Sequence, residues 1–144
     1  MTRISVTVKP KELCDQMLRA EHREIKRIPN KIIKRTNECK PIILHDQPKE
    51  FKLGTGHEKF FYDKIKFLHH RWQDLHQECI NRGFNMTDYS DAFTGVPEKY
   101  YNDWNPDVNV IRPILVERIN LRIDQMKGQP KYYSKTVSKE IIKL

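Results

Sequence analysis

The sequence of 144 residues is poor in cysteine and has no long apolar run. Its three cysteines, Cys14, Cys39 and Cys79, are odd in number and form no closely spaced pair, which argues against a disulfide framework and a cysteine-based metal site. We expect each to be a buried or half-buried thiol. No stretch approaches the roughly 20 apolar residues that a membrane-spanning helix needs, and charged residues precede any apolar signal region. We therefore expect a soluble, intracellular protein.

Acidic residues are outnumbered by basic ones. There are 27 lysines and arginines against 19 aspartates and glutamates, so the net charge is +8 at neutral pH. This surplus favours a polyanionic partner, with nucleic acid the first choice and an acidic membrane surface the second. The length predicts one domain over residues 1–144, and the chain has no repeat or low-complexity tract.

Apolar residues at intervals of three and four predict an all-α protein, a single compact domain of three main helices with long loops. The first helix should run from residue 10 or 11 to the mid-thirties and be kinked or broken by Pro29. The second contains residues 61–79 and should stop at Gly83. The third should run from near 113 to 127. No strand is expected.

The loops and the second helix offer little chemistry of their own. Residues 37–56 and 84–110 are rich in turn-forming residues, and we expect connecting segments with at most short turns of helix. His69, His70 and His76 lie on the second helix and suggest metal, but no cysteine or carboxylate cluster completes a site. We expect these histidines on a solvated face and no metal.

The start of the chain combines a small second residue with a basic region. Because Thr2 is small, we expect Met1 to be removed, which leaves a free α-amino group on Thr2. An α-amine has a pKa of about 7.7–8.0, so roughly a third is neutral near pH 7.5 and able to attack a sugar aldehyde. Glu24, beside Arg23 and Arg27, would be its acid/base partner on a surface suited to phosphate. The pattern predicts an active site here.

Two separated blocks in the first 86 residues strengthen this interpretation. The first block holds Met1-Thr2-Arg3-Ile4, Glu12–Gln16 and Ala20–Arg27; the second holds Leu53–His57, Phe60–Lys64 and Glu78–Asn85. In order and spacing both blocks resemble the pyrimidine-dimer DNA glycosylases, the family of the endonuclease V of T-even phage.

The resemblance implies a DNA-repair enzyme without a cofactor. It would cut the N-glycosidic bond of the 5′ pyrimidine in a UV-induced cyclobutane dimer and then nick the strand by β-elimination. By resemblance, Thr2 is the nucleophile that forms an imine and Glu24 is the catalytic carboxylate. The substrate would be double-stranded DNA with pyrimidine dimers or abasic sites, sharply kinked, with the base opposite the dimer displaced. We expect a monomer in the cytoplasm, on the nucleoid, or in a eukaryotic nucleus.

The resemblance also implies DNA-binding roles for basic side chains near the lesion. Guanidinium groups suit phosphates because their forked donors are always charged. Lys34 matches a family lysine, and a solvated side chain is an equally good interpretation. The residues carried over by the motifs are Arg3, Arg23, Arg27 and Lys34.

Further DNA-binding candidates lie in the second half of the chain. Arg118 and Arg122 are one helical turn apart, and Arg122 aligns with a phosphate-contacting arginine of the family. Tyr132 and Tyr133 lie among lysines, where aromatic rings stack on exposed bases.

The chain departs from the family pattern in several places. Met17 replaces a family histidine, His22 a tyrosine and Lys26 a proline, and the tyrosine pair lacks the preceding tryptophan. Two alternatives therefore remain open: an enzyme of the same scaffold that acts on oxidised purines or abasic sites, and a non-catalytic basic DNA-binding protein. Glu21, which no motif singles out, is expected to be a surface ion-pair partner.

Overall fold

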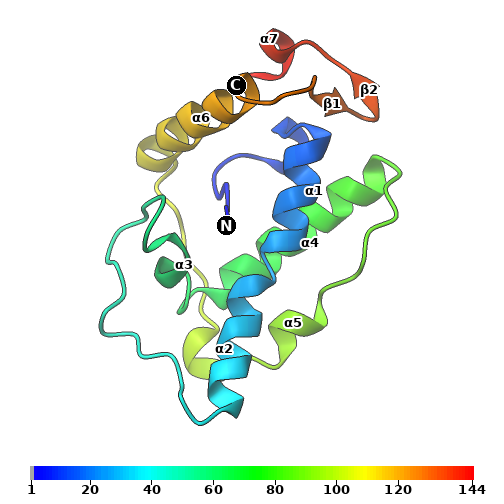
Figure 1. The fold of residues 1–144 in the computed structure, drawn as a ribbon. Helices are drawn as coiled ribbons and strands as arrows, with labels where there is room; N and C mark the ends of the chain where they lie inside the picture. Colours follow the sequence, from blue (N-terminus) through cyan, green and yellow to red (C-terminus); the bar gives the residue numbers. More distant parts are fainter. Residues whose placement is uncertain (1) are drawn as a thin grey trace.

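The computed structural model describes residues 2–144, and its regular structure is almost entirely helical, with long loops between the helices (Figure 1). Helix α1 packs against α4, α2 packs against α5, and η1 lies on α4. The expected all-α class is confirmed. The elements in chain order are η1 (Pro10–Glu12), α1 (Asp15–Glu24), α2 (Arg27–Asn37), α3 (His57–Phe60), α4 (Ile65–Asn81), α5 (Asp91–Thr94), η2 (Glu98–Tyr100), α6 (Val108–Asp124), β1 (Lys131–Tyr132), β2 (Lys135–Thr136) and α7 (Lys139–Ile142).

The first expected helix is divided, but the break precedes Pro29. Helix α1 ends at Glu24 and α2 begins at Arg27, so Pro29 is the third residue of α2, where a missing N–H costs nothing. The proline removes the bond that its N–H would make to the carbonyl of Ile25, one turn earlier. That carbonyl accepts only a long 3.4 Å bond from the Ile28 N–H among the described backbone groups. Pro29 therefore explains a break at residues 25–26.

Helix α6 is longer at its start than the sequence predicts. It begins at Val108, after the side chain of Asp107 accepts a hydrogen bond from the Asn109 N–H, and Pro113 lies inside it. The aspartate is a favourable N-cap, and it sets the boundary ahead of the proline. The helix ends at Asp124 rather than Lys127.

A short hairpin near the C-terminus contradicts the expectation of no strand. Strands β1 and β2 pair antiparallel, and Tyr133 and Ser134 form the turn between them with φ of 50° and 67°. Its turn residues are not glycines, which is why the sequence lacks the usual hairpin signal.

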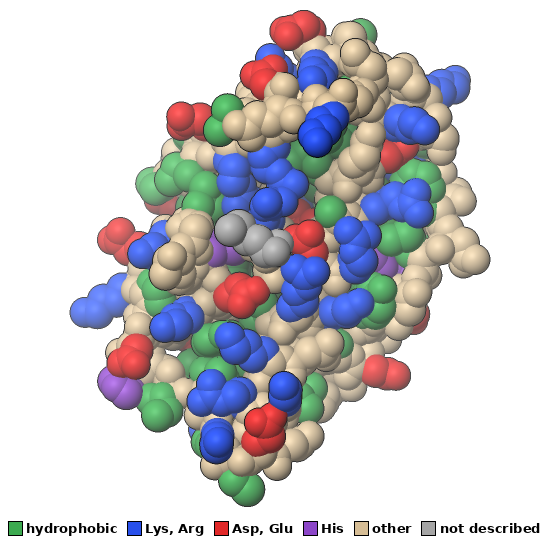
Figure 2. All heavy atoms as spheres, in the orientation of Figure 1, with side chains coloured by type: hydrophobic (Ala, Val, Ile, Leu, Met, Phe, Trp, Pro, Cys, Tyr) green, Lys and Arg blue, Asp and Glu red, His purple; other side chains and the backbone are tan. Residues whose placement is uncertain are grey.

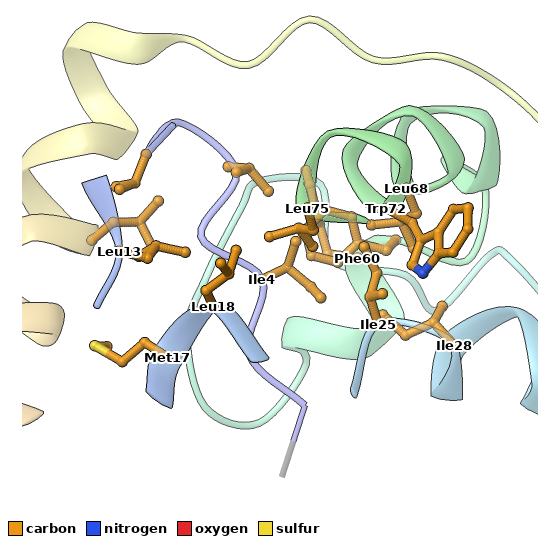
Figure 3. Packing of buried hydrophobic residues seen from close by; sticks show 14 of the residues in the cluster. Ile4, Leu13, Met17, Leu18, Ile25, Ile28, Phe60, Leu68, Trp72 and Leu75 are labelled. Atoms are coloured by element: carbon orange, nitrogen blue, oxygen red, sulfur yellow. The ribbon is translucent and has the colours of Figure 1, made fainter. Parts of the chain in front are cut away.

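The first residues of the chain cross the interior without forming a helix or a strand. Ile4, Val6 and Val8 are buried, and each contributes about 1.5–3 kcal/mol to stability by leaving water. Ile4 lies among Leu18, Leu75 and Phe60 in the hydrophobic core (Figure 3). In Figure 1 the first described residues lie near the centre of the view, between α1, α3 and α6. The start of the chain is therefore part of the core.

The histidines of α4 are packed rather than solvated, which corrects the expectation for two of the three. His69 stacks on Phe93, and His76 stacks on Trp72; only His70 is exposed. Within residues 2–144, no cluster of three or more metal-ligating side chains is present.

Two further expectations concern the cysteines and the membrane. Cys14 and Cys79 are buried free thiols as expected, but Cys39 is exposed, with a φ of 59° just after α2. Over the described part of the chain, no helix has the length and apolar character to cross a membrane.

Candidate active site

Basic side chains gather on one face of the molecule. Figure 2, in the orientation of Figure 1, shows lysines and arginines clustered around the centre of this face. Arg3 comes from the first segment, residues 2–9 ahead of η1, and Arg118 and Arg122 come from α6. The three side chains are close enough for their charges to affect one another's ionisation. The fold thus brings the first segment and α6 together on one basic face.

Glu24 lies in a narrow cleft at the end of α1. Only 9% of this residue is exposed, although it comes from a helix rich in charged residues. The cleft unites the predicted catalytic glutamate with two predicted DNA-binding arginines. Its lining is Arg3, Ser5, Leu13, Met17, Ala20, Glu21, Glu24 and Arg122. Met17, at the position of the family histidine, thus offers the cleft a thioether without acid/base capacity.

Two arginines near Glu24, Arg118 and Arg122, are partly buried and have lowered pKa values. Burial, followed by the nearby charge of Arg122, lowers the pKa of Arg118 to about 10. Burial and the charge of Arg3 also lower the pKa of Arg122, whereas Glu24 opposes this shift. The buried Nε of Arg118 has no hydrogen-bond partner among residues 2–144. A cluster with more cations than carboxylates and an unused donor is suited to an anion such as phosphate.

Thr2 lines a different cavity from Glu24. The residue is 3% exposed and faces a cavity of about 260 Å³. Arg3 and Ser5 line the Glu24 cleft instead, so alternate residues of the first segment face opposite sides. In this chain the backbone nitrogen of Thr2 is still bonded to Met1. Met1 lies outside the described residues, so its expected removal stays a prediction. The Thr2 cavity is lined by Thr2, Lys31, Gly54, Thr55, Gly56, His57, Glu58, Lys59 and Tyr62.

Side chains from α1, α3 and α4 fix the backbone of the first segment. The Ile4 N–H donates to His57 Nε2 at 3.0 Å, and the Ser5 N–H donates to Glu21 Oε1 at 3.2 Å. Arg71 donates to Glu21 Oε2 at 2.7 Å and to the carbonyl of Val8 at 2.6 Å. These side-chain bonds take the place of the backbone hydrogen bonds that a neighbouring strand would supply.

Glu21 is therefore not the surface ion-pair partner that the sequence suggests. Only 4% of it is exposed, and its carboxylate pairs with the buried guanidinium of Arg71 on α4. Its helical position three residues before Glu24 puts both carboxylates on the inner side of α1. The two therefore share the cleft, while among the described residues only Glu21 has a buried cationic partner.

The other predicted DNA-binding side chains are more exposed. Arg23 lies in the last turn of α1 and Arg27 is the first residue of α2, and both side chains are exposed. Lys34 is 77% exposed and lies 4.0 Å from Glu38, a surface pair of little energetic value. The contacts that these residues make with DNA stay predictions.

The tyrosine pair is tied to the protein through its hydroxyl groups. The Tyr132 hydroxyl donates to the carbonyl of Lys11 at 2.7 Å, and the Tyr133 hydroxyl donates to Glu78 Oε2 at 3.0 Å. The guanidinium of Arg82 lies over both rings, 4.5 Å and 5.1 Å from their centres. Tyr133 is nevertheless 42% exposed, so stacking on a base stays a prediction.

His22 replaces the family tyrosine with a wholly buried imidazole. Its Nε2 lies 2.9 Å from Nδ1 of His76, and its ring packs against Trp72 and Tyr89. Burial, followed by the charge of His76, lowers the pKa of His22 to about 4. His22 is therefore neutral near pH 7 and links α1 to α4.

Three residues at the site were not predicted from the sequence: His57, Lys31 and Lys59. His57 stands in the block that resembles the family, but its contact with Ile4 joins residues 53 positions apart. The lysines are two among many on a basic chain. No local pattern identifies such partners.

A known protein family matches the part of the chain that supplies most of this site. A family model described as pyrimidine dimer DNA glycosylase matches residues 1–90 of the 144. The match includes both cavities' residues from the first segment, α1, α2 and α3, and it ends before α6. By the family's description, the substrate is DNA that contains pyrimidine dimers. The chain belongs to the pyrimidine dimer DNA glycosylase family.

Proposed function

We propose that this glycosylase is also an abasic-site lyase, and that both activities use the α-amine of Thr2 after Met1 is removed. The observation that carries the proposal is the position of the first segment. Thr2 lines one cavity, and the next residue, Arg3, lines the cleft that holds Glu24. A free amine on Thr2 would therefore start within the basic face and near a buried carboxylate.

The chemistry needs one amine and one carboxylate. The neutral amine of Thr2 attacks C1′ of the damaged nucleotide, the C1′–N bond breaks, and the base leaves with a proton. Glu24 stabilises the positive charge that develops on the sugar and transfers protons as the ring opens. The imine then acidifies C2′–H, and loss of that proton expels the 3′ phosphate and cuts the strand. Abasic DNA would enter the same sequence after base loss.

The basic cluster would hold the phosphates on either side of the reacting sugar. Arg3 and Arg122 line the Glu24 cleft and Arg118 lies close to them, and the three have more positive charge than the carboxylates neutralise. Extruding a nucleotide costs a few kcal/mol, and less at a poorly stacked dimer. Phosphate contacts would supply this energy. One chain holds all these groups, so we propose a monomer as the active form.

Borohydride trapping tests this function. Protein with Met1 removed is incubated with duplex DNA that carries one thymine dimer, and borohydride is added to reduce any imine. We expect a covalent protein–DNA band that disappears when the N-terminal amine is acetylated. Trapping on abasic DNA alone would retain the lyase and reject the dimer chemistry. Trapping on neither substrate would reject the proposal, and trapping on an oxidised purine instead would indicate a different lesion.

A further inference from the structure

The first segment forms no helix or strand, so other residues must supply hydrogen-bond partners for its buried backbone groups. Each of these partners helps to fix the position of the segment. The nearest anchor to Thr2 is the bond from the Ile4 N–H to His57 Nε2, at 3.0 Å. Between this anchor and the Thr2 nitrogen the backbone has only about three rotatable bonds, since the peptide units are planar. Whatever fixes the Ile4 N–H therefore limits where the Thr2 nitrogen can lie.

His57 is itself held in one orientation and one tautomer. Its Nδ1 lies 2.8 Å from the carbonyl of Lys52, and because a carbonyl only accepts, Nδ1 carries the proton. Nε2 is therefore left as an acceptor facing the Ile4 N–H. The ring is 3% exposed and has edge contacts with Phe51 and Phe61, with centres 5.4 Å and 5.2 Å away. Burial lowers the pKa of His57, which favours this neutral form.

The same histidine lines the cavity that Thr2 faces. The anchor therefore acts at the reacting end of the segment and not at a remote point of the fold. We propose that His57 is a positioning residue that aims the α-amine of Thr2 at the sugar, an inference that rests on the proposed function. Glu21 holds the next N–H, that of Ser5, and completes a two-point clamp.

The expected size of the rate loss follows from how strongly a reaction rate depends on the position of the nucleophile. A nucleophile displaced by about 1 Å loses on the order of 10²-fold in rate, although its intrinsic reactivity is unchanged. Loss of the His57 acceptor should therefore slow imine formation on DNA while leaving DNA affinity unaltered. It should also leave the amine fully reactive toward a small aldehyde, which needs no alignment.

Three variants separate positioning from simple stability. His57→Phe keeps an aromatic ring but removes the acceptor, and His57→Gln restores an acceptor through its amide oxygen. His69→Phe is the matched control, because His69 also packs on an aromatic ring and bonds to the Tyr101 hydroxyl but lies outside both cavities. Each protein, with Met1 removed, is measured below its melting temperature under single-turnover, saturating conditions on dimer DNA. Borohydride trapping gives the rate, and reductive methylation with formaldehyde gives the intrinsic reactivity of the amine.

We expect His57→Phe to trap about 10²-fold more slowly, with normal affinity for DNA and a normal methylation rate. His57→Gln should recover most of the trapping rate, and His69→Phe should match the wild type. If His57→Phe does not fold, hydrogen exchange of the Ile4 amide in His57→Gln replaces it as the test. An Ile4 amide that stays protected together with a normal trapping rate supports the inference. An Ile4 amide that loses its protection while trapping stays normal overturns it. Wild-type trapping by folded His57→Phe would also overturn it and leave the proposed function intact. A wild-type protein that never traps would reject the proposed function itself.

Discussion

Two glutamates on α1 show how similar residues acquire different roles. Glu21 and Glu24 line the same cleft, but only Glu21 has a buried guanidinium, that of Arg71, against its carboxylate. Glu24 instead faces Arg3 and Arg122, side chains that belong to the basic face. The first carboxylate is therefore structural, and the second is available for chemistry.

Replacing Glu24 should separate binding from cleavage. Glu24→Gln removes the charge that would stabilise the sugar cation but keeps the size of the side chain. We expect folding and dimer-DNA affinity to be retained and the cleavage rate to fall by about 10²–10⁴-fold, the usual contribution of an acid/base group. Gel analysis of nicked DNA, alongside a filter-binding measurement, checks this. Full cleavage activity would remove Glu24 from the mechanism.

Replacing Glu21 should have the opposite outcome. Glu21→Ala leaves the Arg71 guanidinium buried without its partner and also frees the Ser5 N–H. Breaking one side of a buried ion pair costs about 3–5 kcal/mol, so the free energy of unfolding should fall by that amount. Urea denaturation followed by circular dichroism measures it. A loss below about 1 kcal/mol, the value of an exposed pair, would mean that the pair is effectively solvated.

At the scale of the elements, the sequence predicts helices that show a local apolar period. It does not predict boundaries and paths that depend on contacts with residues distant in the chain. Helix α4 follows from its apolar period and from Gly83, whose φ is 80° just beyond the helix. The start of α6 depends on the Asp107 cap, which competes with Pro113 as a boundary signal. The path of residues 2–9 depends on bonds to His57, Glu21 and Arg71, which no spacing along the chain reveals.

The packing of α1 on α4 should respond to acid through His22. The pKa of His22 is lowered from 6.5 to about 4, so the unfolded chain binds a proton in a pH range where the folded protein does not. Its contribution to stability is complete above pH 6.5, falls as the pH drops toward 4, and levels off below, for a total of at most about 3 kcal/mol.

Thermal melts between pH 7 and 4 check this prediction. In His22→Phe the decline should become shallower, though not absent, because burial also lowers the pKa of His57 and His69. Identical melting curves against pH for the two proteins would contradict it.

The C-terminal hairpin offers a test of base stacking. Tyr133 is half exposed, and its hydroxyl bonds to Glu78. Tyr133→Phe keeps the ring and should retain the affinity for dimer DNA, whereas Tyr133→Ala should weaken it by about 1–3 kcal/mol, the value of one stacked base. Fluorescence anisotropy with labelled DNA measures both. Equal weakening in the two variants would assign Tyr133 to holding the hairpin rather than to DNA.

At the scale of the whole molecule, the fold unites charges that the sequence keeps far apart. Arg3 lies at one end of the chain and Arg122 more than a hundred residues later, yet both line the cleft that holds Glu24. Burial lowers the pKa of Arg118 and Arg122, and the charges of neighbouring arginines add to both shifts. Phosphates bound beside these arginines would neutralise part of this charge and release counterions of the duplex.

The cluster of arginines predicts how the affinity for dimer DNA depends on salt concentration. Each phosphate neutralised adds about 0.9 to the negative slope of log K against log salt concentration, so Arg122→Met should make that slope shallower by about 0.9. Lys143→Met is the control, because Lys143 is already paired with Asp124 and Glu140 and should leave the slope unchanged. Titrations of dimer DNA over a range of salt concentrations measure both variants. Equal slopes for Arg122→Met and the wild type would place the phosphate contacts elsewhere on the basic face, whereas the expected difference would tie α6, which lies beyond the family match, to DNA binding.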